Sequence, residues 1–361
     1  MLKLLTYLPF FSFHNFRYLK LFDELAKKFK VFVFAGAPPR SSDVKKVVRY
    51  KLLHVVPFYL PGRIRQIYYP LYRIIMPLNI VGADVIWLIE KTGPPQLLLT
   101  KKPIILDLES PRVTLPIEEL YRQPMLYLKN ELRLLRSRKI SKIVVTTQII
   151  KKKLVMLGVE EEKISVIPYG VDTSLFFPTP LPSEPVILYY GAFPPFRTRL
   201  LLETVKHIAR KRKDAKFILI GNIPSHIKVI LRSILGSNVE MYDLIEHDQL
   251  PRYLQRARVC ILPQDRSLGG RLSFKLLEYM ASGRPVVSTN VDESFPLKES
   301  GAGIVTEVDP QSFEDAVIRL LEDDALANHL ARKGVEYAQR YDWNKMVEDY
   351  IKLFQQVCNE S

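Results

Sequence analysis

The chain has 361 residues, of which 47% are hydrophobic and 25% are charged. This apolar content excludes an intrinsically disordered protein, and the length predicts two domains because one core rarely serves more than roughly 250–300 residues. The sequence contains no apolar run long enough for a transmembrane helix, and its first residues lack the order of a signal peptide. We therefore expect a cytoplasmic protein. Its two cysteines, Cys260 and Cys358, fit neither a disulfide framework nor zinc spacing.

The net charge of +15 lies entirely in the first half of the chain. Residues 1–178 contain 29 Lys and Arg against 14 Asp and Glu, whereas residues 179–361 contain 24 Lys and Arg against 24 Asp and Glu. A basic domain predicts an anionic partner, such as a membrane surface, a phosphorylated lipid or nucleic acid. Scattered lysines such as Lys45 and Lys163 are more typical of a solvated surface that keeps the protein soluble.

The first half alternates short apolar strands with helices. An amphipathic helix at 14–29 places Phe16, Leu19, Phe22 and Leu25 on one side. Strands are expected at 2–10, 30–36, 83–89, 102–108 and 142–147, and further helices near 116–138 and at 148–157.

The same alternation restarts after residue 184. Strands are expected at 185–191, 216–221, 258–263 and 285–290, and helices at 197–211, at 224–235 and after Ser273. Short apolar strands alternating with helices predict parallel sheets that helices cover on both faces. Two such runs in tandem predict two doubly wound α/β domains, with ligands bound beyond the carboxyl ends of the strands.

A proline-rich segment separates the two halves. Five prolines from Pro168 to Pro185 exclude a helix or a central strand, and so predict a linker. A last helix is expected at about 343–357, after the second alternation has ended. The predicted parts are therefore residues 1–168, residues 169–340 and a terminal segment at 341–357.

Gly269 and Gly270 precede the helix that is expected to begin after Ser273. The unpaired amides of a helix's first turn can bind an anion, although glycines before helices are common and this evidence is weak alone. Glu278 lies at the edge of the apolar face of that helix. Burial of its carboxylate is costly without hydrogen bonds, so the residues leave two interpretations open: a functional carboxylate, or one that caps a loop or lies in water.

Four motifs occur in a family's order: LKNELRLLRSRKISKIVVTTQIIKKKLVMLGVEEEKISVIPYGVDTSLFFP, ILYYGAFPPFRT, KLLEYMASGRPVVST and YDWNKMVEDYIKLF. As a set they resemble glycosyltransferases of the GT-B fold, in particular family 4, from about residue 120 to 357. The resemblance implies two Rossmann-like domains that face a cleft. The first is on the acceptor side, the second binds a nucleotide sugar, and the C-terminal helix returns to the first domain. Residues 1–115 share only the layout.

The resemblance also implies a donor site in the second domain. Glu278 matches the glutamate that accepts hydrogen bonds from the ribose of a nucleotide sugar. The amides of Leu272, Ser273 and Phe274 are expected to meet the diphosphate at the helix N-terminus. Arg197 stands where the family has a lysine for the diphosphate. Arg197 and Glu278 are therefore the predicted catalytic residues.

Several positions depart from the family. Ala192 replaces an arginine that stabilises the leaving diphosphate, and Gly270 replaces a glutamate that contacts the donor sugar. Arg271 or Arg199 is a candidate for the missing charge, and the amides near Gly269 are candidates for holding the sugar.

Two further departures lie at the hinge and in the first loop. The sequence IPYGVD resembles the family's hinge signature, with Tyr169 where asparagine is usual. PFFSFHN, at 9–15, replaces a glycine-rich loop.

The predicted reaction transfers a sugar from a nucleoside diphosphate sugar to an acceptor hydroxyl, with the retention of configuration that the resemblance implies. Fixed cations and a helix N-terminus can stabilise the departing diphosphate, so we expect neither a metal nor another cofactor. The nearest match to a metal-binding Asp-x-Asp motif is the stretch from Asp107 to Glu109.

Two acceptor-side residues are predicted in the first domain. Glu109 ends a strand, and it either orients the acceptor or caps the helix that follows Pro111. His14 ends the first loop, and it either contacts acceptor or phosphate or caps a surface helix.

The acceptor is predicted to be a lipid-linked glycan. Residues 58–80 interleave tyrosines with arginines, and phenylalanines crowd the first loop at Phe10, Phe11, Phe13 and Phe16. Aromatic and basic residues together are typical of a membrane interface, which predicts a peripheral enzyme on the inner face of the membrane. The phenylalanines are also typical of a domain core.

Two other functions fit parts of the sequence. A nucleic-acid-binding protein is also basic with interleaved aromatics, but no recognised nucleic-acid motif is present, so none is expected as a partner. A GT-B scaffold that binds a nucleotide or a partner without turnover would explain Ala192 and Gly270.

Overall fold

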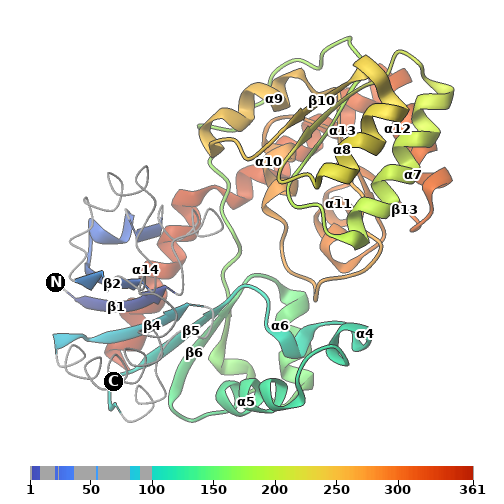
Figure 1. Cartoon of the computed structure of the whole chain (residues 1–361). Helices are drawn as coiled ribbons and strands as arrows, with labels where there is room; N and C mark the ends of the chain where they lie inside the picture. The colour runs from blue at the N-terminus through green and yellow to red at the C-terminus, as the bar shows by residue number, and fades with distance from the viewer. Residues whose placement is uncertain are drawn as a thin grey trace. The chain divides into compact units, whose positions relative to one another are not determined.

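The computed structural model describes residues 2–8, 21–22, 24–35, 54–55, 82–89 and 100–360. It divides into two compact units, one of Met1–Tyr169 with Asn344–Ser361 and one of Gly170–Trp343 (Figure 1). His14, the first loop at 9–15 and the segment 58–80 lie outside the described residues.

In its described part, the first unit has a parallel sheet of seven strands in the order β3-β2-β1-β4-β5-β6-β7. The strands are β1 (Lys3–Leu8), β2 (Lys30–Ala35), β3 (His54–Val55), β4 (Val85–Ile89), β5 (Ile104–Leu108), β6 (Ile140–Val145) and β7 (Ile164–Val166). The helices whose bounds the described residues give are α4 (Ile117–Leu120), α5 (Met125–Leu135), α6 (Gln148–Met156) and α14 (Trp343–Asn359), and residues 21–22 and 24–26 are also helical, within the helix expected at 14–29.

Helices cover both faces of this sheet, because side chains of a strand point alternately to opposite faces. In β4, Val85, Trp87 and Ile89 belong to one core cluster, to which α14 contributes apolar residues from Val347 to Val357. Ile86 and Leu88 belong to a second cluster on the other face, which α5 and α6 complete. The C-terminal helix therefore packs into the first unit, where Figure 1 shows it in red.

A buried hydrogen-bonded carboxylate joins α14 to the sheet. Asp107 is fully buried in β5, and its Oδ2 accepts from Trp87 Nε1 at 3.2 Å and from the Tyr350 hydroxyl at 2.7 Å. The Trp87 and Tyr350 rings also pack with their centroids 5.6 Å apart. Asp107 therefore has a structural role. It is also the first carboxylate of the Asp107–Glu109 stretch, the nearest match to a metal-binding motif, and it is already hydrogen-bonded to Trp87 and Tyr350.

The second unit has six strands in the order β10-β9-β8-β11-β12-β13, all parallel. The strands are β8 (Val186–Tyr190), β9 (Lys216–Ile220), β10 (Val239–Tyr242), β11 (Val259–Leu262), β12 (Val286–Thr289) and β13 (Gly303–Thr306). The helices are α7 (Pro195–Lys211), α8 (Ser225–Leu235), α9 (Leu250–Arg256), α10 (Phe274–Ala281), α11 (Phe295–Ser300), α12 (Pro310–Glu322) and α13 (Asp324–Ala338).

Both units are doubly wound α/β layers, so the predicted fold class is confirmed. In the second sheet, the chain passes from β8 outward to β9 and β10 and then returns to the other side of β8 with β11. The strand order therefore reverses between β8 and β11, which is where doubly wound sheets bind ligands.

Two details differ from the sequence-based expectation. The helical segment near 116–138 is two helices, because Pro124 cannot continue α4 and instead is the N-cap of α5. Strands β3, β7, β10 and β13, and helices α9 and α11 to α13, were not expected. All four strands are short and lie at sheet edges, and the half-buried residues of β7, β10 and β13 give no continuous apolar run.

The chain crosses between the units next to a glycine of the IPYGVD stretch. In the second unit, Val171 N donates to Tyr341 O at 2.7 Å and Trp343 N donates to Val171 O at 3.2 Å. A Cβ on Gly170 would lie 2.5 Å from the Trp343 ring. A side chain at this position would displace the indole, so the close approach requires glycine.

None of the helices in the described part of the chain is both long and apolar enough to span a membrane.

Replacement of Tyr350 by phenylalanine should destabilise the first unit, since the buried Asp107 carboxylate loses one of its two side-chain donors. A hydrogen bond to a charged group contributes about 1.5–3 kcal/mol, so urea denaturation should show a loss of that size. Tyr121→Phe is the matched control because Tyr121 is 83% exposed. Equal midpoints for Tyr350→Phe and the wild type would contradict the structural role of this contact.

Candidate active site

The predicted donor-site residues of the second unit gather beyond the carboxyl ends of β8 and β11. Gly191 directly follows β8, and Gln264 lies two residues beyond β11. The segment from Gln264 to Ser273 then leads into α10. The site is therefore built at the point where the strand order reverses, as expected for a doubly wound sheet.

The glycine loop before α10 is fixed by a buried carboxylate. Glu293 Oε1 accepts from the amides of Leu268 at 2.8 Å and Gly270 at 2.9 Å. Gly269 and Gly270 have φ angles of 96° and 86°, which favour glycine, and the Gly269 amide donates to Ser267 Oγ at 3.2 Å. These two amides therefore have acceptors within the chain. They do not support the expectation that amides near Gly269 hold the sugar.

Arg197 is joined to this loop through one side chain. Gln264 accepts from Arg197 Nη2 at 3.0 Å with its amide oxygen, and its amide nitrogen donates to Glu293 Oε2 at 2.9 Å. The two contacts fix which way the Gln264 amide points. Among the described residues, no carboxylate forms an ion pair with Arg197, whose guanidinium is met by neutral groups such as the Gln264 amide and the Phe196 ring, 5.2 Å away at its centroid.

The N-terminus of α10 provides amide donors. Ser273 is the N-cap, as predicted, but its side chain makes no capping hydrogen bond. Within the described part of the chain, the amides of Leu272 and Ser273 have no hydrogen-bond acceptor. Leu272 and Ser273 directly precede Phe274, the first helical residue, so their amides lie at the end of α10 where the helix dipole favours negative charge. An anion site at Leu272, Ser273 and Phe274 remains a prediction, for which the amides of Leu272 and Ser273 are available.

Glu278 is buried in α10 and is 6% exposed. Its Oε1 lies 2.7 Å from His247 Nε2, whereas its Oε2 is buried without a hydrogen-bond partner among the described residues. Burial raises the pKa of the Glu278 carboxyl well above its usual range. The interpretation as a solvated glutamate is therefore wrong. The side chain instead offers one oxygen with an unmet capacity to accept.

His247 and Lys275 are site residues that the sequence did not indicate. His247 lies 31 positions before Glu278, in the short turn His247–Gln249, and the ring of Phe176 meets the His247 ring edge to face at 5.1 Å. No spacing in the sequence predicts that contact, because it depends on how β10 and α10 are placed in the fold.

Lys275 extends over the end of β8. A Cβ on Gly191 would lie 2.1 Å from Lys275 Nζ, so the ammonium group occupies the space that the glycine leaves. The nitrogen also lies 5.1 Å and 5.4 Å from the ring centroids of Tyr189 and Tyr190. No carboxylate among the described residues pairs with it. Lys275 stands three residues before Glu278 in the KLLEYM motif, which is the sequence signal that could have found it.

Lys275 is surrounded by positive charge. Burial lowers the pKa of the Lys275 ammonium well below its usual range, and Arg197 and Arg271 lower the pKa further. The positive charges of Arg197 and Arg271 thus act on the buried Lys275 side chain, and among the described residues no carboxylate forms an ion pair with Arg197 or Lys275. An anion would stabilise this arrangement.

The two arginines proposed to replace the missing cation at Ala192 differ. Arg199 is 73% exposed, and its guanidinium lies 3.7 Å from the Asp265 carboxylate. Arg271 instead acts on Lys275. Of the two arginines, only Arg271 therefore remains a candidate for the cation that is missing at Ala192.

Glu109 directly follows β5 in the first unit, and its carbonyl accepts from Thr146 Oγ1 at 3.5 Å. Neither an acceptor role nor a capping role follows from this contact. His14, the other predicted acceptor-side residue, is outside the described residues.

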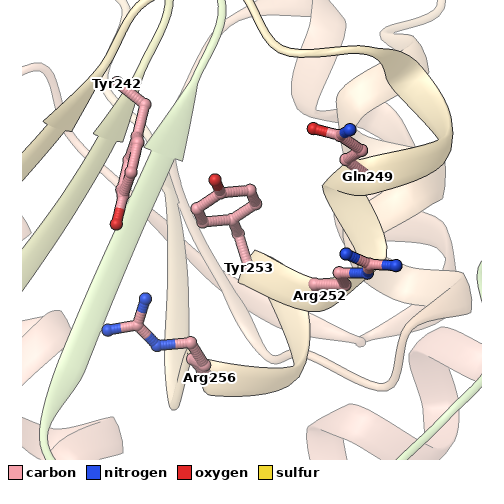
Figure 2. A pocket seen from close by; sticks show the side chains of 5 residues that line it. All are labelled: Tyr242, Gln249, Arg252, Tyr253 and Arg256. Atoms are coloured by element: carbon pink, nitrogen blue, oxygen red, sulfur yellow. The ribbon is translucent and has the colours of Figure 1, made fainter.

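A pocket of about 260 Å³ lies elsewhere on the second unit, between β10 and α9 (Figure 2). Its lining is formed by Tyr242, Gln249, Arg252, Tyr253 and Arg256. Arg256 is already paired with Glu240, to which Tyr242 also donates. None of the predicted site residues lines this pocket, and its volume is below the roughly 300–1,000 Å³ usual for ligand sites.

Comparison with known proteins assigns most of the chain to glycosyltransferase families. Residues 17–175 match the family model described as Glycosyltransferase Family 4, and residues 184–323 match the model described as Glycosyl transferases group 1. The two matches follow the two units.

Individual relatives agree with this assignment. A D-inositol 3-phosphate glycosyltransferase of Acidothermus cellulolyticus is 24% identical over 57% of this chain and 50% of its own length. The N,N'-diacetylbacillosaminyl-diphospho-undecaprenol alpha-1,3-N-acetylgalactosaminyltransferase of Campylobacter jejuni is 24% identical over 56% of each chain. The chain thus spans about half the length of these curated relatives.

A solved structure shares the fold over the whole length. The Anabaena protein HepE in complex with UDP-glucose has a TM-score of 0.77 to this chain, covers 99% of it and 100% of HepE, and is 14% identical.

Glu278→Gln should stabilise the unliganded protein near neutral pH. The folded-state pKa of this carboxyl lies above its ordinary value, so its protonated form is compatible with burial and stability is lost as the pH rises through the folded pKa. Glutamine is neutral at every pH. We expect its free energy of unfolding to exceed that of the wild type by about 1 kcal/mol near pH 8, and the difference to vanish towards acid.

Thermal melting between about pH 5 and about pH 8 measures this difference. A glutamine variant that is less stable than the wild type by the same amount at every pH would show instead that Glu278 has a purely structural role.

Proposed function

This chain belongs to the GT-B glycosyltransferases and is similar to family 4, and on that premise we propose that it transfers a sugar from a nucleoside diphosphate sugar to an acceptor hydroxyl. The observation that carries the proposal is the buried Glu278 carboxylate of α10, one oxygen of which has no hydrogen-bond partner among the described residues. A buried acceptor of this kind is costly unless a ligand supplies the donor.

In this proposal Glu278 binds the ribose. His247 Nε2 and Glu278 Oε1 share one hydrogen bond, which orients the carboxylate and leaves Oε2 for a ribose hydroxyl. The nucleoside is thereby anchored deep in the second unit, and its diphosphate is directed towards the start of α10.

The diphosphate is held by amides and cations. The amides of Leu272, Ser273 and Phe274 supply hydrogen bonds and the favourable end of a helix dipole. Arg197 supplies a fixed charge that no carboxylate in the described chain neutralises. Lys275 supplies a second charge and compensates for Ala192, because its nitrogen lies directly beside Gly191.

The reaction breaks the bond between the anomeric carbon and the diphosphate oxygen, which leaves with the electron pair. The acceptor oxygen forms the new bond, on the same face of the sugar if configuration is retained as in the family, and one proton is released. The barrier lies in the charge that develops on the diphosphate. In this proposal Arg197, Lys275 and the helix amides stabilise that charge electrostatically, without a metal or other cofactor.

We propose that the acceptor is a lipid-linked glycan at an anionic membrane surface. The first half of the chain carries the whole net charge of +15. The matched Campylobacter protein is named for a diphospho-undecaprenol acceptor, although the matched Acidothermus protein is named for D-inositol 3-phosphate. A peripheral enzyme on the inner face of the membrane is consistent with the charge.

A scaffold that binds nucleotide without turnover is the second candidate. It is favoured by one observation: the Gly270 amide is bound to Glu293, so position 270 carries no side chain or amide for the donor sugar. Donor binding without product across a broad panel of acceptors would favour this candidate.

Glu278→Ala should weaken nucleotide binding. Calorimetric titration with UDP, GDP, ADP and dTDP should find a nucleotide that binds the wild type, and the substitution should weaken it about 10–100-fold, the effect of losing hydrogen bonds to a charged group. Glu203→Ala is the control, since Glu203 is an exposed carboxylate of α7. Absence of binding by all four nucleotides at millimolar concentration would refute the donor site.

Lys275→Met should weaken binding of the diphosphate part of the nucleotide without weakening binding of the nucleoside part. We expect UDP to bind about 10–100-fold more weakly, because a charge-assisted contact is lost, while the affinity for uridine stays unchanged. Glu278→Ala should weaken both ligands. Lys206→Met removes an equal charge from an exposed position of α7 and should leave both affinities unchanged. Equal weakening of UDP and uridine by Lys275→Met would place the lysine away from the phosphates.

A further inference from the structure

Exposed apolar side chains gather where α4 meets α5 in the first unit. Within eleven consecutive residues, five large hydrophobic side chains are more than half exposed: Ile117 61%, Tyr121 83%, Met125 64%, Leu126 70% and Tyr127 61%. We call these five residues the α4–α5 surface. Apolar side chains scattered singly need no explanation, but a contiguous group of this size usually marks an interaction site.

The backbone beneath this surface is well anchored. Glu131 of α5 is buried, and its two carboxylate oxygens accept from the amides of Arg112 at 3.0 Å and Val113 at 3.1 Å. Thr114 Oγ1 donates to Pro111 O at 2.7 Å. The Arg112 guanidinium lies 5.5 Å from the ring centroid of Tyr127. The exposed groups are therefore presented by a fixed frame, which costs little ordering entropy on docking.

The surrounding segment is basic. Residues 111–139 contain seven Lys and Arg against three Glu. Of the three acids, Glu131 is occupied by backbone amides, and Glu119 is paired with Arg122 at 2.8 Å. Glu118 is exposed. The net charge that faces a partner is thus positive.

We infer that the α4–α5 surface docks the first unit onto an anionic lipid bilayer. Tyr and Met side chains around a turn suit the boundary between headgroups and acyl chains, and the neighbouring cations suit anionic headgroups. A second copy of the chain fits less well, because two surfaces with the same positive charge would repel each other. The surface is consequently matched to lipid by both its apolar area and its charge.

This docking would bring a membrane-bound acceptor to the first unit, which carries the predicted acceptor-side Glu109. The benefit to catalysis rests on the proposed function, whereas the binding to vesicles does not. The two proposals can therefore fail separately.

The test is co-sedimentation of the full-length chain with phosphatidylcholine vesicles, with and without phosphatidylglycerol. The variant combines Tyr121→Ser, Met125→Ser and Leu126→Ser. Its matched control combines Met156→Ser, Val229→Ser and Leu244→Ser, which alter residues 86%, 68% and 67% exposed. All six positions are exposed, so both triple variants should melt at the temperature of the wild type.

We expect the wild type to bind vesicles that contain phosphatidylglycerol, the α4–α5 variant to bind at least about tenfold more weakly, and the control to bind as the wild type does. Lys129→Ala should weaken binding about fivefold, and only with the anionic lipid. Titration with UDP, GDP, ADP and dTDP on the same samples reports the donor site independently.

Three results would overturn the inference. They are a wild type that does not bind anionic vesicles, an α4–α5 variant that binds them as the wild type does, and a wild-type dimer in light scattering that the α4–α5 variant abolishes while vesicle binding is absent. Absence of binding by UDP, GDP, ADP and dTDP alike in the wild type, with vesicle binding intact, would contradict the proposed function and leave this surface assignment standing.

Discussion

The buried carboxylate of Glu293 determines the shape of the candidate donor site. It accepts from the amides of Leu268 and Gly270 and from the side chain of Gln264, and Gln264 in turn accepts from Arg197. One acid thus fixes both the loop that leads into α10 and the position of the arginine. The Glu293 carboxylate accepts hydrogen bonds from neutral donors and forms no ion pair with Arg197. The positive charge of Arg197 therefore remains available to an anion.

The same site has an electrostatic cost when it is empty. The Glu278 carboxyl and the Lys275 ammonium are both desolvated, and their pKa values are shifted towards the neutral forms. The two groups do not pair with each other in the described contacts. A nucleoside diphosphate would resolve both costs, with ribose hydroxyls for the carboxylate and phosphate oxygens for the ammonium. Strained, uncompensated polar groups of this kind are typical of functional sites.

The sequence predicted the layers of both units because buried parallel strands are continuous apolar runs. It missed β10 and β13, whose residues are half-buried at sheet edges. For the site, periodicity alone left Glu278 ambiguous, and the resemblance to a family assigned it. His247 and Glu293 could not be found in this way, since each acts through contacts between residues distant in sequence that only the folded chain creates. Lys275 belongs to the same KLLEYM motif as Glu278, but its position beside Gly191 is visible only in the folded chain.

The two departures from the family pattern have different consequences. At Ala192 the missing cation has a substitute close by, because the Lys275 ammonium lies beside Gly191 and has no paired acid in the described chain. At Gly270 there is no equivalent: the residue has a φ of 86°, which disfavours any side chain, and the nearby Glu293 carboxylate is already satisfied by the loop. The diphosphate side of the site is therefore better preserved than the sugar side. If donor binding is retained, the sugar must be selected by groups other than residue 270.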